Sequence, residues 1–394
     1  MVLTNKQEEG LKIAVARHRA HEKYTVIAGY AGTGKSTLVR FIIEALDVEP
    51  NKVCYATFTG KAAQVLAKKG NKNSMTLHRL LFDSIPKPGG GFTRIPKKVL
   101  DYTVVVVDEV SMAPKSIMDR LFMHNAYVIC LGDPFQLPPI DKDEDNHLLD
   151  HPHIFLDEIM RQATESGIIR LTMDIRDQKP IDYIKNDQVQ VYPVSALCDG
   201  MLGWADQVLT ATNLTRHSMN DYMRTMKGFG PEPCDGDKII CLRNYWDLSN
   251  LSNGDPLVNG SIGTLHNPEK GIIRVPYYAY NPGIIHVLNG QFVSELGENY
   301  GTLQMDPRIM QGGESELEWR DKYKLNKLKN RIGDVIPKEF TYGYAITCHK
   351  AQGSEWDKVL VIEDKFPYDK VDHARWLYTA ATRASEKLVL ITKD

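Results

Sequence analysis

The sequence predicts an α/β fold with two doubly wound parallel-sheet domains and a small β-barrel inserted in the second. The chain has 394 residues, more than twice the roughly 150 expected of one domain. Near both ends, short apolar runs alternate with longer helical patterns, as in parallel sheets whose strands are buried on both faces. Between these regions, short strand-like runs are separated by Gly, Asn and Pro, which is typical of an antiparallel barrel.

The first domain is expected over residues 1–150. Strands are predicted at 24–29, 53–58, 102–108 and 127–133, and helices at 36–46 and 61–69. The segment SIPKPGGGFTRIP (84–96) interrupts the alternation with Pro and Gly and carries one aromatic residue. Such a segment is either a surface loop or a hairpin with a function of its own.

The second domain is expected over residues 151–236 and 341–394, after an acidic, polar crossing from Asp141 to Asp150. Its predicted strands are 207–213, 358–364 and 387–393, and its predicted helices are 217–227 and 373–383. The inserted β-rich domain is expected over residues 237–340. Within it, Glu316–Arg331 predicts a charged helix with a solvated face.

Composition narrows the possible classes of protein. Lys and Arg total 48 against 50 Asp and Glu, so any phosphate-binding surface must be a local groove rather than a basic exterior. The six cysteines form no C-x-x-C pair, which indicates a reducing compartment rather than a disulfide framework or a zinc site. The N-terminus is polar and no apolar run approaches the roughly 18 residues of a membrane span. We therefore expect a cytoplasmic protein, with no membrane partner.

The motif GYAGTGKS (29–36) matches G-x-x-x-x-G-K-[ST] and lies between a predicted buried strand and a helix. Glycines allow backbone N–H groups to close around phosphates, and the helix N-terminus adds a favourable dipole. Lys35 is expected to reach the β- and γ-phosphates of ATP, and Ser36 to ligate Mg²⁺. The alternative is a glycine-rich turn with no ligand.

Acidic and amide side chains follow the next predicted strands. VVVVDE (104–109) places Asp108 and Glu109 at the carboxyl end of a strand, the edge where such sheets bind ligands. Asp108 fits the carboxylate that holds the metal, and Glu109 fits the base that orients the attacking water, although paired acids at a strand end can also simply cap a helix. LGDPFQLPPI (131–140) then places Asp133 and Gln136 beside the γ-phosphate, where a Gln can sense the bound phosphate.

Taken together, these motifs resemble those of the superfamily-one DNA helicases of the B class, the group that contains RecD and the phage helicase Dda. The resemblance covers nearly the whole chain, in order. The matching segments are LTNKQ (3–7), ATFTGKAA (56–63), TLHRLL (76–81), DEVSM (108–112), GDPFQLPP (132–139), DEIMRQ (157–162), AITCHKAQGSEWD (345–357) and LYTAATRA (377–384). Phe58 stands where the family often has a proline, which is a small departure.

The resemblance implies two RecA-like domains, an SH3-like barrel at 237–340, and roles for particular residues. Gln7 would read adenine, Arg161 would contact the γ-phosphate, and Arg383 would be the arginine finger. The implied catalytic residues are Lys35, Asp108, Glu109, Gln136, Arg161 and Arg383. The implied nucleotide-binding residues are Gln7, Gly29, Gly32, Thr33, Gly34, Lys35, Ser36, Thr37 and Glu355, with ATP and Mg²⁺ as ligands and Ser36 and Asp108 on the metal.

The resemblance also implies binding of single-stranded and forked DNA and movement from 5′ to 3′. Hydroxyl, amide and ring contacts would hold the strand. The implied contacts are Thr57, Thr59, Lys61, His78, Thr347, His349 and Lys350. The insertion 84–97 lies where the family places a pin that separates strands, and Phe92 is its candidate stacking residue.

The family's processes are DNA replication, recombination and repair, in a bacterial or phage-infected cytoplasm. Single-strand-binding, replication or recombination proteins are the expected protein partners. Four alternatives remain open at this point: a motor subunit of a larger recombination nuclease complex, a DNA-stimulated ATPase that does not unwind, a binding protein with a decayed ATPase, and a P-loop enzyme acting on protein. RNA is a further possible substrate, because phosphate and stacking contacts tolerate both nucleic acids.

Overall fold

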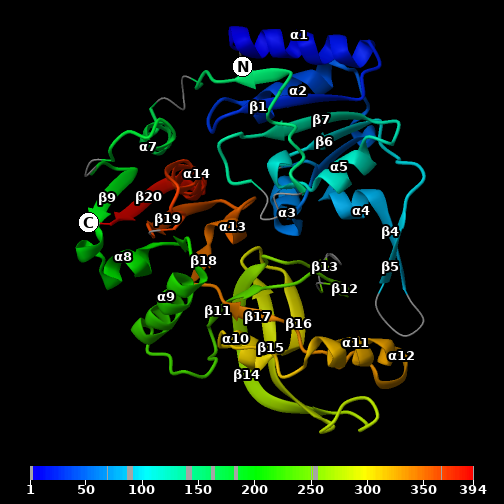
Figure 1. Ribbon diagram of the computed structural model, residues 1–394, viewed down its shortest axis with the longest axis vertical. Helices are drawn as coiled ribbons and strands as arrows, with labels where there is room; N and C mark the ends of the chain where they lie inside the picture. Colours follow the sequence, from blue (N-terminus) through cyan, green and yellow to red (C-terminus); the bar gives the residue numbers. More distant parts are fainter. Residues whose placement is uncertain are drawn as a thin grey trace. The chain divides into compact units, whose positions relative to one another are not determined.

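The computed structural model describes residues 3–68, 70–86, 92–138, 144–160, 165–181, 185–249, 251, 256–364 and 366–393 (Figure 1). Contacts divide the chain into two compact units. Unit 1 comprises Met1–Phe82, Pro96–Thr212 and Thr347–Asp394, and unit 2 comprises Asp83–Ile95 and Asn213–Ile346. None of the helices in the described part of the chain has the length and apolar character needed to cross a bilayer.

The first sheet of unit 1 has six strands in the order β3-β2-β6-β7-β1-β8, and each neighbouring pair runs parallel. The strands are β1 (Tyr24–Gly29), β2 (Val53–Thr57), β3 (Ser74–Thr76), β6 (Val104–Val107), β7 (Tyr127–Gly132) and β8 (Ile154–Leu156). The four strands predicted for this region are therefore present. Strand β8, which pairs with β1, lies beyond residue 150, where the sequence suggests that the first domain ends.

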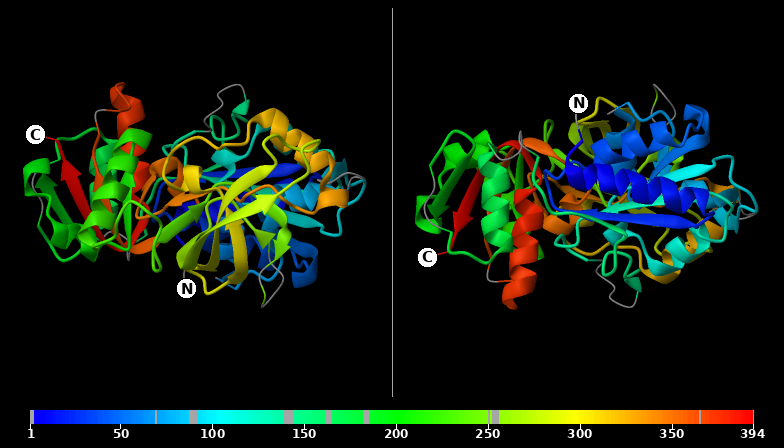
Figure 2. Two further views of the ribbon diagram at one scale, coloured as in Figure 1. Left: turned by 90° about the horizontal axis from the view of Figure 1, so that it is seen from below. Right: turned by 90° about the horizontal axis from the view of Figure 1, so that it is seen from above.

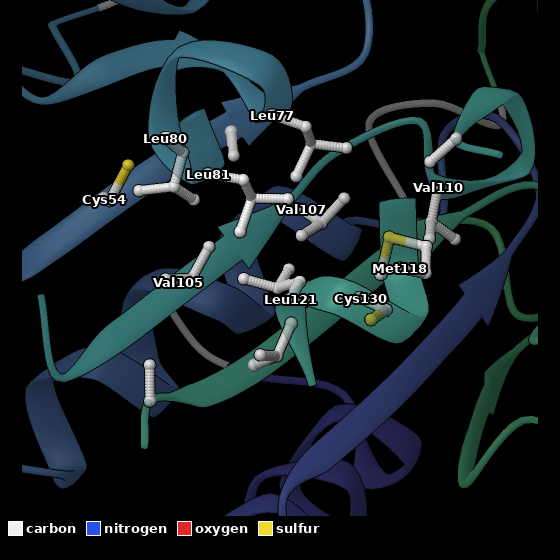
Figure 3. Close-up of a cluster of buried hydrophobic side chains, with 14 of the residues drawn as sticks. Cys54, Leu77, Leu80, Leu81, Val105, Val107, Val110, Met118, Leu121 and Cys130 are labelled. Atoms are coloured by element: carbon white, nitrogen blue, oxygen red, sulfur yellow. The ribbon is translucent and has the colours of Figure 1, made fainter. Parts of the chain in front are cut away.

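Both faces of this sheet are covered, because successive residues of β6 pack into different cores. Val105 and Val107 join a cluster that includes side chains from α4 (Leu77–Leu81) and α5 (Lys115–Leu121) (Figure 3). Val104 and Val106 join a second cluster, with side chains of α2 (Lys35–Ala45). All four valines are at most 1% exposed, and burying each one stabilises the fold by about 1.5–3 kcal/mol. The doubly wound parallel arrangement is confirmed for this sheet.

The second sheet of unit 1 has five strands in the order β18-β10-β19-β20-β9. They are β9 (Val189–Pro193), β10 (Gln207–Thr210), β18 (Ala345–Thr347), β19 (Trp356–Ile362) and β20 (Ala384–Thr392). The pairs β10–β19, β19–β20 and β20–β9 run parallel. Helix α14 (Lys370–Ala381) packs on this sheet beside α7 (Gly167–Arg176), and Figure 2 shows it next to the red strand β20.

Unit 2 contains a five-stranded antiparallel sheet in the order β16-β15-β14-β11-β17. Its strands are β11 (Lys238–Cys241), β14 (Ile262–Arg274), β15 (Ile284–Ser294), β16 (Asn299–Met305) and β17 (Phe340–Tyr342). Strands β12 (Tyr245–Ser249) and β13 (Pro256–Leu257) form a separate pair, as do β4 (Phe82–Pro86) and β5 (Phe92–Pro96) in the segment around 84–96. The β-rich character expected of residues 237–340 is present.

Helix α9 (Asn213–Met226) belongs by its contacts to unit 2, whereas the sequence suggests that it is part of the second parallel domain. Its Arg224 is buried and donates to the Asp237 carboxylate at 2.9 and 3.0 Å. The ring of Tyr342 lies 4.0 Å from the Arg224 guanidinium carbon. This buried ion pair attaches the helix to the start of the antiparallel sheet.

The charged helix predicted at 316–331 is interrupted. Helix α11 spans Trp319–Lys327 and α12 spans Lys329–Ile332. One side of α11 is not solvated, because Leu325 is 1% exposed and packs in an apolar cluster with residues of β15. Glu318 and Asp321 form a reciprocal capping box that fixes where α11 begins.

Candidate nucleotide and nucleic-acid site

The phosphate-binding loop connects β1 to α2. Gly32 and Gly34 both have φ of +77°, in the left-handed region. At Gly34 a side chain is excluded by space as well, because a Cβ there would lie 2.5 Å from Gln7 Nε2 and from Met160 Sδ. The glycine at the end of the loop therefore lets the backbone turn directly into the N-terminus of α2, where N–H groups point out of the helix.

Lys35 is the first residue of α2, and its side chain folds back over the loop. Its Nζ donates to the carbonyl oxygens of Gly29 at 2.7 Å and Tyr30 at 3.0 Å. Ser36 follows it and is exposed, while Thr37 is half-buried. The structure thus places a cation and an exposed hydroxyl at the same loop, and their roles toward a triphosphate and its metal stay predictions.

Gln7 lies on α1 (Asn5–Arg19) and is buried against the loop. Its Nε2 donates to Thr33 O at 3.2 Å, and its Oε1 accepts from Thr4 N at 3.1 Å. Both ends of the amide are therefore used within the protein. The position beside the loop suits a nucleotide contact, and reading of adenine by Gln7 stays a prediction.

Asp108 and Glu109 follow β6 directly, at the carboxyl edge of the sheet. Asp108 Oδ1 accepts from Glu109 N at 3.0 Å, and Asp108 N donates to Ala56 O at 3.0 Å. Glu109 has φ of +54°, a left-handed conformation that costs a non-glycine residue about 1–3 kcal/mol. Backbone strain of this kind concentrates at functional sites, because the surrounding structure must hold the residue in place.

Glu109, Gln136 and Arg383 form a polar group that joins the two parallel sheets. In the amide orientation that satisfies its neighbours, Gln136 donates to Glu109 Oε2 at 2.8 Å and accepts from Arg383 Nη2 at 3.2 Å. Arg383 Nη1 also lies 3.8 Å from Glu109 Oε1. Three residues separated widely in the sequence therefore converge, and all three are among the predicted catalytic residues.

Arg383 lies after α14 and is only 6% exposed. Its guanidinium donates to the carbonyl oxygens of Thr379 at 3.1 Å and Ser354 at 3.3 Å. Ser354 and Glu355 belong to the segment resembling motif V, and the side chain of Glu355 is exposed. The backbone of that segment thus helps to hold Arg383 toward the first sheet.

Tyr378 is a residue that the sequence reasoning missed. Its hydroxyl accepts from Ala31 N in the phosphate loop at 2.9 Å and donates to Asp133 Oδ2 at 2.6 Å. Burial, and next the charge of Asp133, raise the pKa of Tyr378, so the group stays a neutral hydroxyl. Its presence in LYTAATRA (377–384) was the available signal, but no spacing rule indicates which residue of that helix reaches the loop.

Asp133 is 2% exposed, and burial raises the pKa of its carboxyl. The nearby Lys35 ammonium and the Tyr378 hydrogen bond act in the opposite direction without cancelling the effect of burial. Phe135 N donates to Asp133 Oδ1 at 3.0 Å, and the Phe135 ring meets that of Tyr378 edge-on at 5.3 Å. Asp133 thus links the phosphate loop to the segment that carries Gln136.

The residues predicted to contact DNA after β2 lie in a segment that packs against the second sheet. Thr57 is buried, and its hydroxyl donates to Thr59 O at 2.8 Å. Lys61, in α3 (Gly60–Lys68), places its Nζ 4.8 Å from the centre of the Trp356 ring. Gly353 has φ of +73°, and a Cβ there would come 2.7 Å from Ala62 Cβ. The segments resembling motifs Ia and V therefore touch.

The predicted histidines have different surroundings. His78 is half-buried between two aromatic rings, with centroids 5.6 Å from Phe58 and 6.1 Å from Phe82. His349 lies in α13 (Cys348–Ala351), and burial lowers its pKa, so it is a neutral hydrogen-bonding group at neutral pH. Thr347 and Lys350 flank His349 and are half-buried. Each of these side chains is therefore only partly accessible to a DNA strand.

The side chains of two predicted site residues lie outside the part of the chain that the structure describes. Arg161 lies outside the described residues. The backbone of Phe92 begins β5, but its side chain also lies outside them. Met160 is described, and its N donates to Gly32 O at 3.1 Å, so residue 160 lies beside the phosphate loop.

Comparisons with known proteins agree with this arrangement. A family model described as an AAA domain matches residues 3–192, and one described as a UvrD-like helicase C-terminal domain matches residues 342–391. The ATP-dependent RecD2 DNA helicase of Deinococcus radiodurans is 25% identical over 395 residues, covering 93% of this chain and 47% of that protein. The ATP-dependent DNA helicase Dda of enterobacteria phage T4 is 27% identical over 189 residues, covering 45% of this chain and 43% of that protein.

Among solved structures, the Bacteroides Pif1 helicase in complex with ADP-AlF3 and ssDNA matches 99% of this chain and 92% of its own, with a TM-score of 0.53 and 17% identity. At that identity the likeness concerns the fold. The chain spans less than half the length of the first two curated relatives it matches.

The fold and the site define a P-loop nucleotide-binding protein in which two parallel sheets meet at the phosphate loop. Within that class, the matched domains and relatives make the chain similar to the superfamily-one helicases of the B class, the RecD- and Dda-like group.

Proposed function

We propose that the protein is an ATP-dependent DNA helicase that moves 5′ to 3′ along single-stranded DNA and unwinds duplex DNA. The observation that carries the proposal is the polar network from the phosphate loop and Glu109 to Gln136 and Arg383 across the two parallel sheets. Such a network makes the geometry of the second sheet depend on what lies at the phosphate loop. Dependence of this kind is what a motor needs.

In the proposed reaction, the phosphates of ATP lie against the loop, and Lys35 exchanges its carbonyl partners for phosphate oxygens. Glu109 orients the attacking water, and Gln136 holds Glu109 in position. Arg383, together with Arg161, neutralises charge that develops on the transferred phosphoryl group. Gln7, Thr33 and Thr37 complete the nucleotide pocket, with Glu355 on the second sheet.

Ser36 and Asp108 fit a magnesium ion, because Mg²⁺ prefers hydroxyl and carboxylate oxygens. No group of three or more His, Cys, Asp or Glu suited to a metal occurs in the described part of the chain. A metal that also binds phosphate oxygens and water needs no such group. When bound there, Mg²⁺ would neutralise charge on the β- and γ-phosphates.

The DNA strand is proposed to cross both parallel sheets. On the first sheet it would meet Thr57, Thr59, Lys61 and His78, and on the second Thr347, His349 and Lys350. The contact of Lys61 with Trp356 supports a continuous path, since it joins the two halves of this set. The partly buried, mixed character of these side chains suits hydroxyl, amide and stacking contacts.

The domain organisation is proposed to be two RecA-like domains with inserts. The first lies within residues 1–150 together with β8, and the second within 151–236 and 341–394, less helix α9. The antiparallel sheet of unit 2 supports an SH3-like barrel at 237–340. The pair β4–β5 supports a strand-separating pin at 84–97.

The test is ATP hydrolysis with and without single-stranded DNA, for the wild type and for Lys35→Ala. We expect strong stimulation by DNA in the wild type and loss of turnover in the variant, because Lys35 neutralises phosphate charge. Circular dichroism should show that the variant remains folded. Near-normal turnover by Lys35→Ala would overturn the assignment of the site, and absence of DNA stimulation in the wild type would overturn the helicase proposal.

A further inference from the structure

Helix α11 of unit 2 carries an exposed ladder of aromatic and basic side chains on the side away from its core. Trp319 and Tyr323 are 75% and 51% exposed, and their rings stack with centroids 5.5 Å apart and planes inclined by 15°. Lys327 continues the ladder, with its Nζ 4.4 Å from the centre of the Tyr323 ring. These three residues are spaced four apart, which places them one above another on the helix.

Packing does not explain the ladder. The apolar attachment of the helix is made by Leu325, which lies 200° around the helix from Tyr323 at about 100° per residue. Trp319, Arg320, Tyr323, Lys324 and Lys327 fall instead within an arc of about 140°. We call these five residues the α11 face. All five are exposed, so truncating one of them opens no cavity in the core.

The α11 face lies in a strongly basic stretch of an otherwise neutral chain. Residues 319–332 contain six Lys or Arg side chains and one Asp, whereas the whole chain has a formal net charge of −2. Lys322 pairs with Glu339 at 2.9 Å and Lys329 with Asp334 at 3.1 Å. Arg320, Lys324 and Arg331 make no ion pair with any residue that the structure describes. Their charge is available to a partner.

Aromatic rings open to solvent and cations around them are the two features that bind single-stranded nucleic acid without regard to sequence. An aromatic ring stacks on any base, and the cations track the phosphates. An acidic protein segment would use the cations but would gain little from a stacked Trp and Tyr. The combination therefore favours a polynucleotide with unpaired bases over a peptide.

We propose that the α11 face is an accessory binding site for single-stranded DNA, at which bases stack on Trp319 while Arg320, Lys324 and Lys327 contact phosphates. It is separate from the path over the parallel sheets in unit 1, and it rests on the proposed function in that the strand is the one the motor handles. The hairpin β4–β5 belongs to the same unit as the α11 face. A strand released at a fork is thus the natural occupant.

The test measures the affinity of the full chain for oligothymidylates of increasing length, with Trp319→Ala, Trp319→Phe and Tyr368→Ala. Tyr368 is the matched control, because it is 84% exposed, its ring meets that of Phe366 at 5.9 Å, and acidic residues Asp369 and Asp372 lie nearby in the sequence. A stack is worth about 1–3 kcal/mol, or roughly 5- to 150-fold in affinity. Trp319→Ala should lose about that much on long strands only.

Three further results are expected. Trp319→Phe should restore most of the affinity, Tyr368→Ala should match the wild type, and a long strand with abasic sites should bind the wild type about as weakly as Trp319→Ala binds intact DNA. Lys324→Ala should reduce the slope of log affinity against log salt by about 0.7 on long strands. If Trp319→Ala and the wild type had equal affinity for strands of every length, the proposed site would be wrong. It would also be wrong if Trp319→Ala lost affinity by the same factor on short and on long strands.

Binding of a polyglutamate peptide tests the alternative that the α11 face binds an acidic protein segment. If it bound the wild type but not Trp319→Ala, and long DNA bound both alike, the α11 face would be a peptide site and the proposal would be wrong. If the wild type neither bound single-stranded DNA nor hydrolysed ATP faster in its presence, the proposed function itself would fail. That result is distinguishable, because it appears before any variant is compared.

Discussion

At the scale of single residues, the hydroxyl of Tyr378 connects a helix of the second parallel sheet to the phosphate loop. It lies on a helix of the second sheet, yet its two hydrogen bonds reach the phosphate loop and Asp133 on the first. Tyr378 and Asp133 are buried and Ala31 is half-buried, so loss of either bond removes a hydrogen-bond partner that water replaces poorly. Tyr378 is thus a positioning residue for the loop and for the segment carrying Gln136.

Tyr378→Phe should therefore change turnover more than nucleotide binding. The ring would still pack on Phe135, while the Ala31 N–H and the Asp133 carboxyl each lose a partner, at a cost of about 1–3 kcal/mol. We expect kcat for DNA-stimulated hydrolysis to fall roughly 5- to 150-fold, with KM for ATP changing less. Tyr368→Phe removes an exposed hydroxyl and serves as the control. A fall in stability with unchanged kcat would show that the hydroxyl is only structural.

Arg383→Ala should bind ATP but hydrolyse it very slowly. An arginine finger stabilises charge that is present only in the transition state, and is typically worth about 10³–10⁵ in rate. Binding of a fluorescent ATP analogue and single-turnover hydrolysis measure the two properties separately. Arg383→Lys keeps the charge but cannot reproduce the forked contacts with Thr379 O and Ser354 O, so it should recover only part of the rate. Collapse of ATP affinity with unchanged turnover would make Arg383 a ground-state contact.

At the scale of elements, the parallel sheets were predictable because burial on both faces leaves continuous apolar runs such as VVVV (104–107). Strand β8 was not, because it has three residues and alternates buried with exposed. The positions of Lys35 beside the phosphate loop and of Asp108 and Glu109 at a strand end likewise follow from their motifs, and their roles stay predictions. Tyr378 was not predictable, because its role depends on how two sheets meet, which no local pattern records.

The helices of unit 2 show the same limit. The charge pattern of residues 316–331 predicted a helix correctly but not the break at Leu328 or the buried position of Leu325. Both depend on the apolar cluster beneath the helix, whose buried members come from β15, from the segment between β14 and β15, and from residues 317–335. Assignment of α9 to unit 2 likewise depends on tertiary contacts, among them the buried ion pair of Arg224 with Asp237 and the hydrogen bonds between Asn220 and Ala345.

For the hairpin β4–β5, we expect Phe92→Ala to impair duplex unwinding much more than ATP hydrolysis stimulated by single strands. An aromatic residue at the tip of such a pair can stack on any arriving base, worth about 1–3 kcal/mol. Thr93→Ala is the matched control, since it changes the next residue of the same strand and removes no aromatic ring. Equal loss of unwinding and hydrolysis in the Phe92 variant would leave an ordinary loop.

At the scale of the whole molecule, a neutral chain can still hold a polyanion if its cations are local. The net charge of −2 conceals the basic stretch around α11 and the few cations near the parallel sheets. Attraction through the overall field is therefore weak, and binding should depend on short-range contacts with one strand. This arrangement suits a protein that binds and releases one DNA strand in each cycle of hydrolysis, rather than a protein that covers long stretches of DNA.

The direction of that movement is the remaining property of the whole molecule. The resemblance to the B class implies travel from 5′ to 3′, and in the proposed function the network through Gln136 and Arg383 would let hydrolysis shift one sheet against the other. Two forked duplexes decide the matter, one with only a 5′ single-stranded tail and one with only a 3′ tail, each incubated with ATP and an excess of trapping strand. We expect unwinding of the 5′-tailed duplex alone, because a motor that loads on that tail travels toward the junction.

Lys35→Ala should unwind neither, which shows that separation requires hydrolysis and is not strand capture by binding alone. Unwinding confined to the 3′-tailed duplex would reverse the polarity while leaving the ATPase site intact. Hydrolysis without separation of either substrate would identify a translocating ATPase that does not unwind.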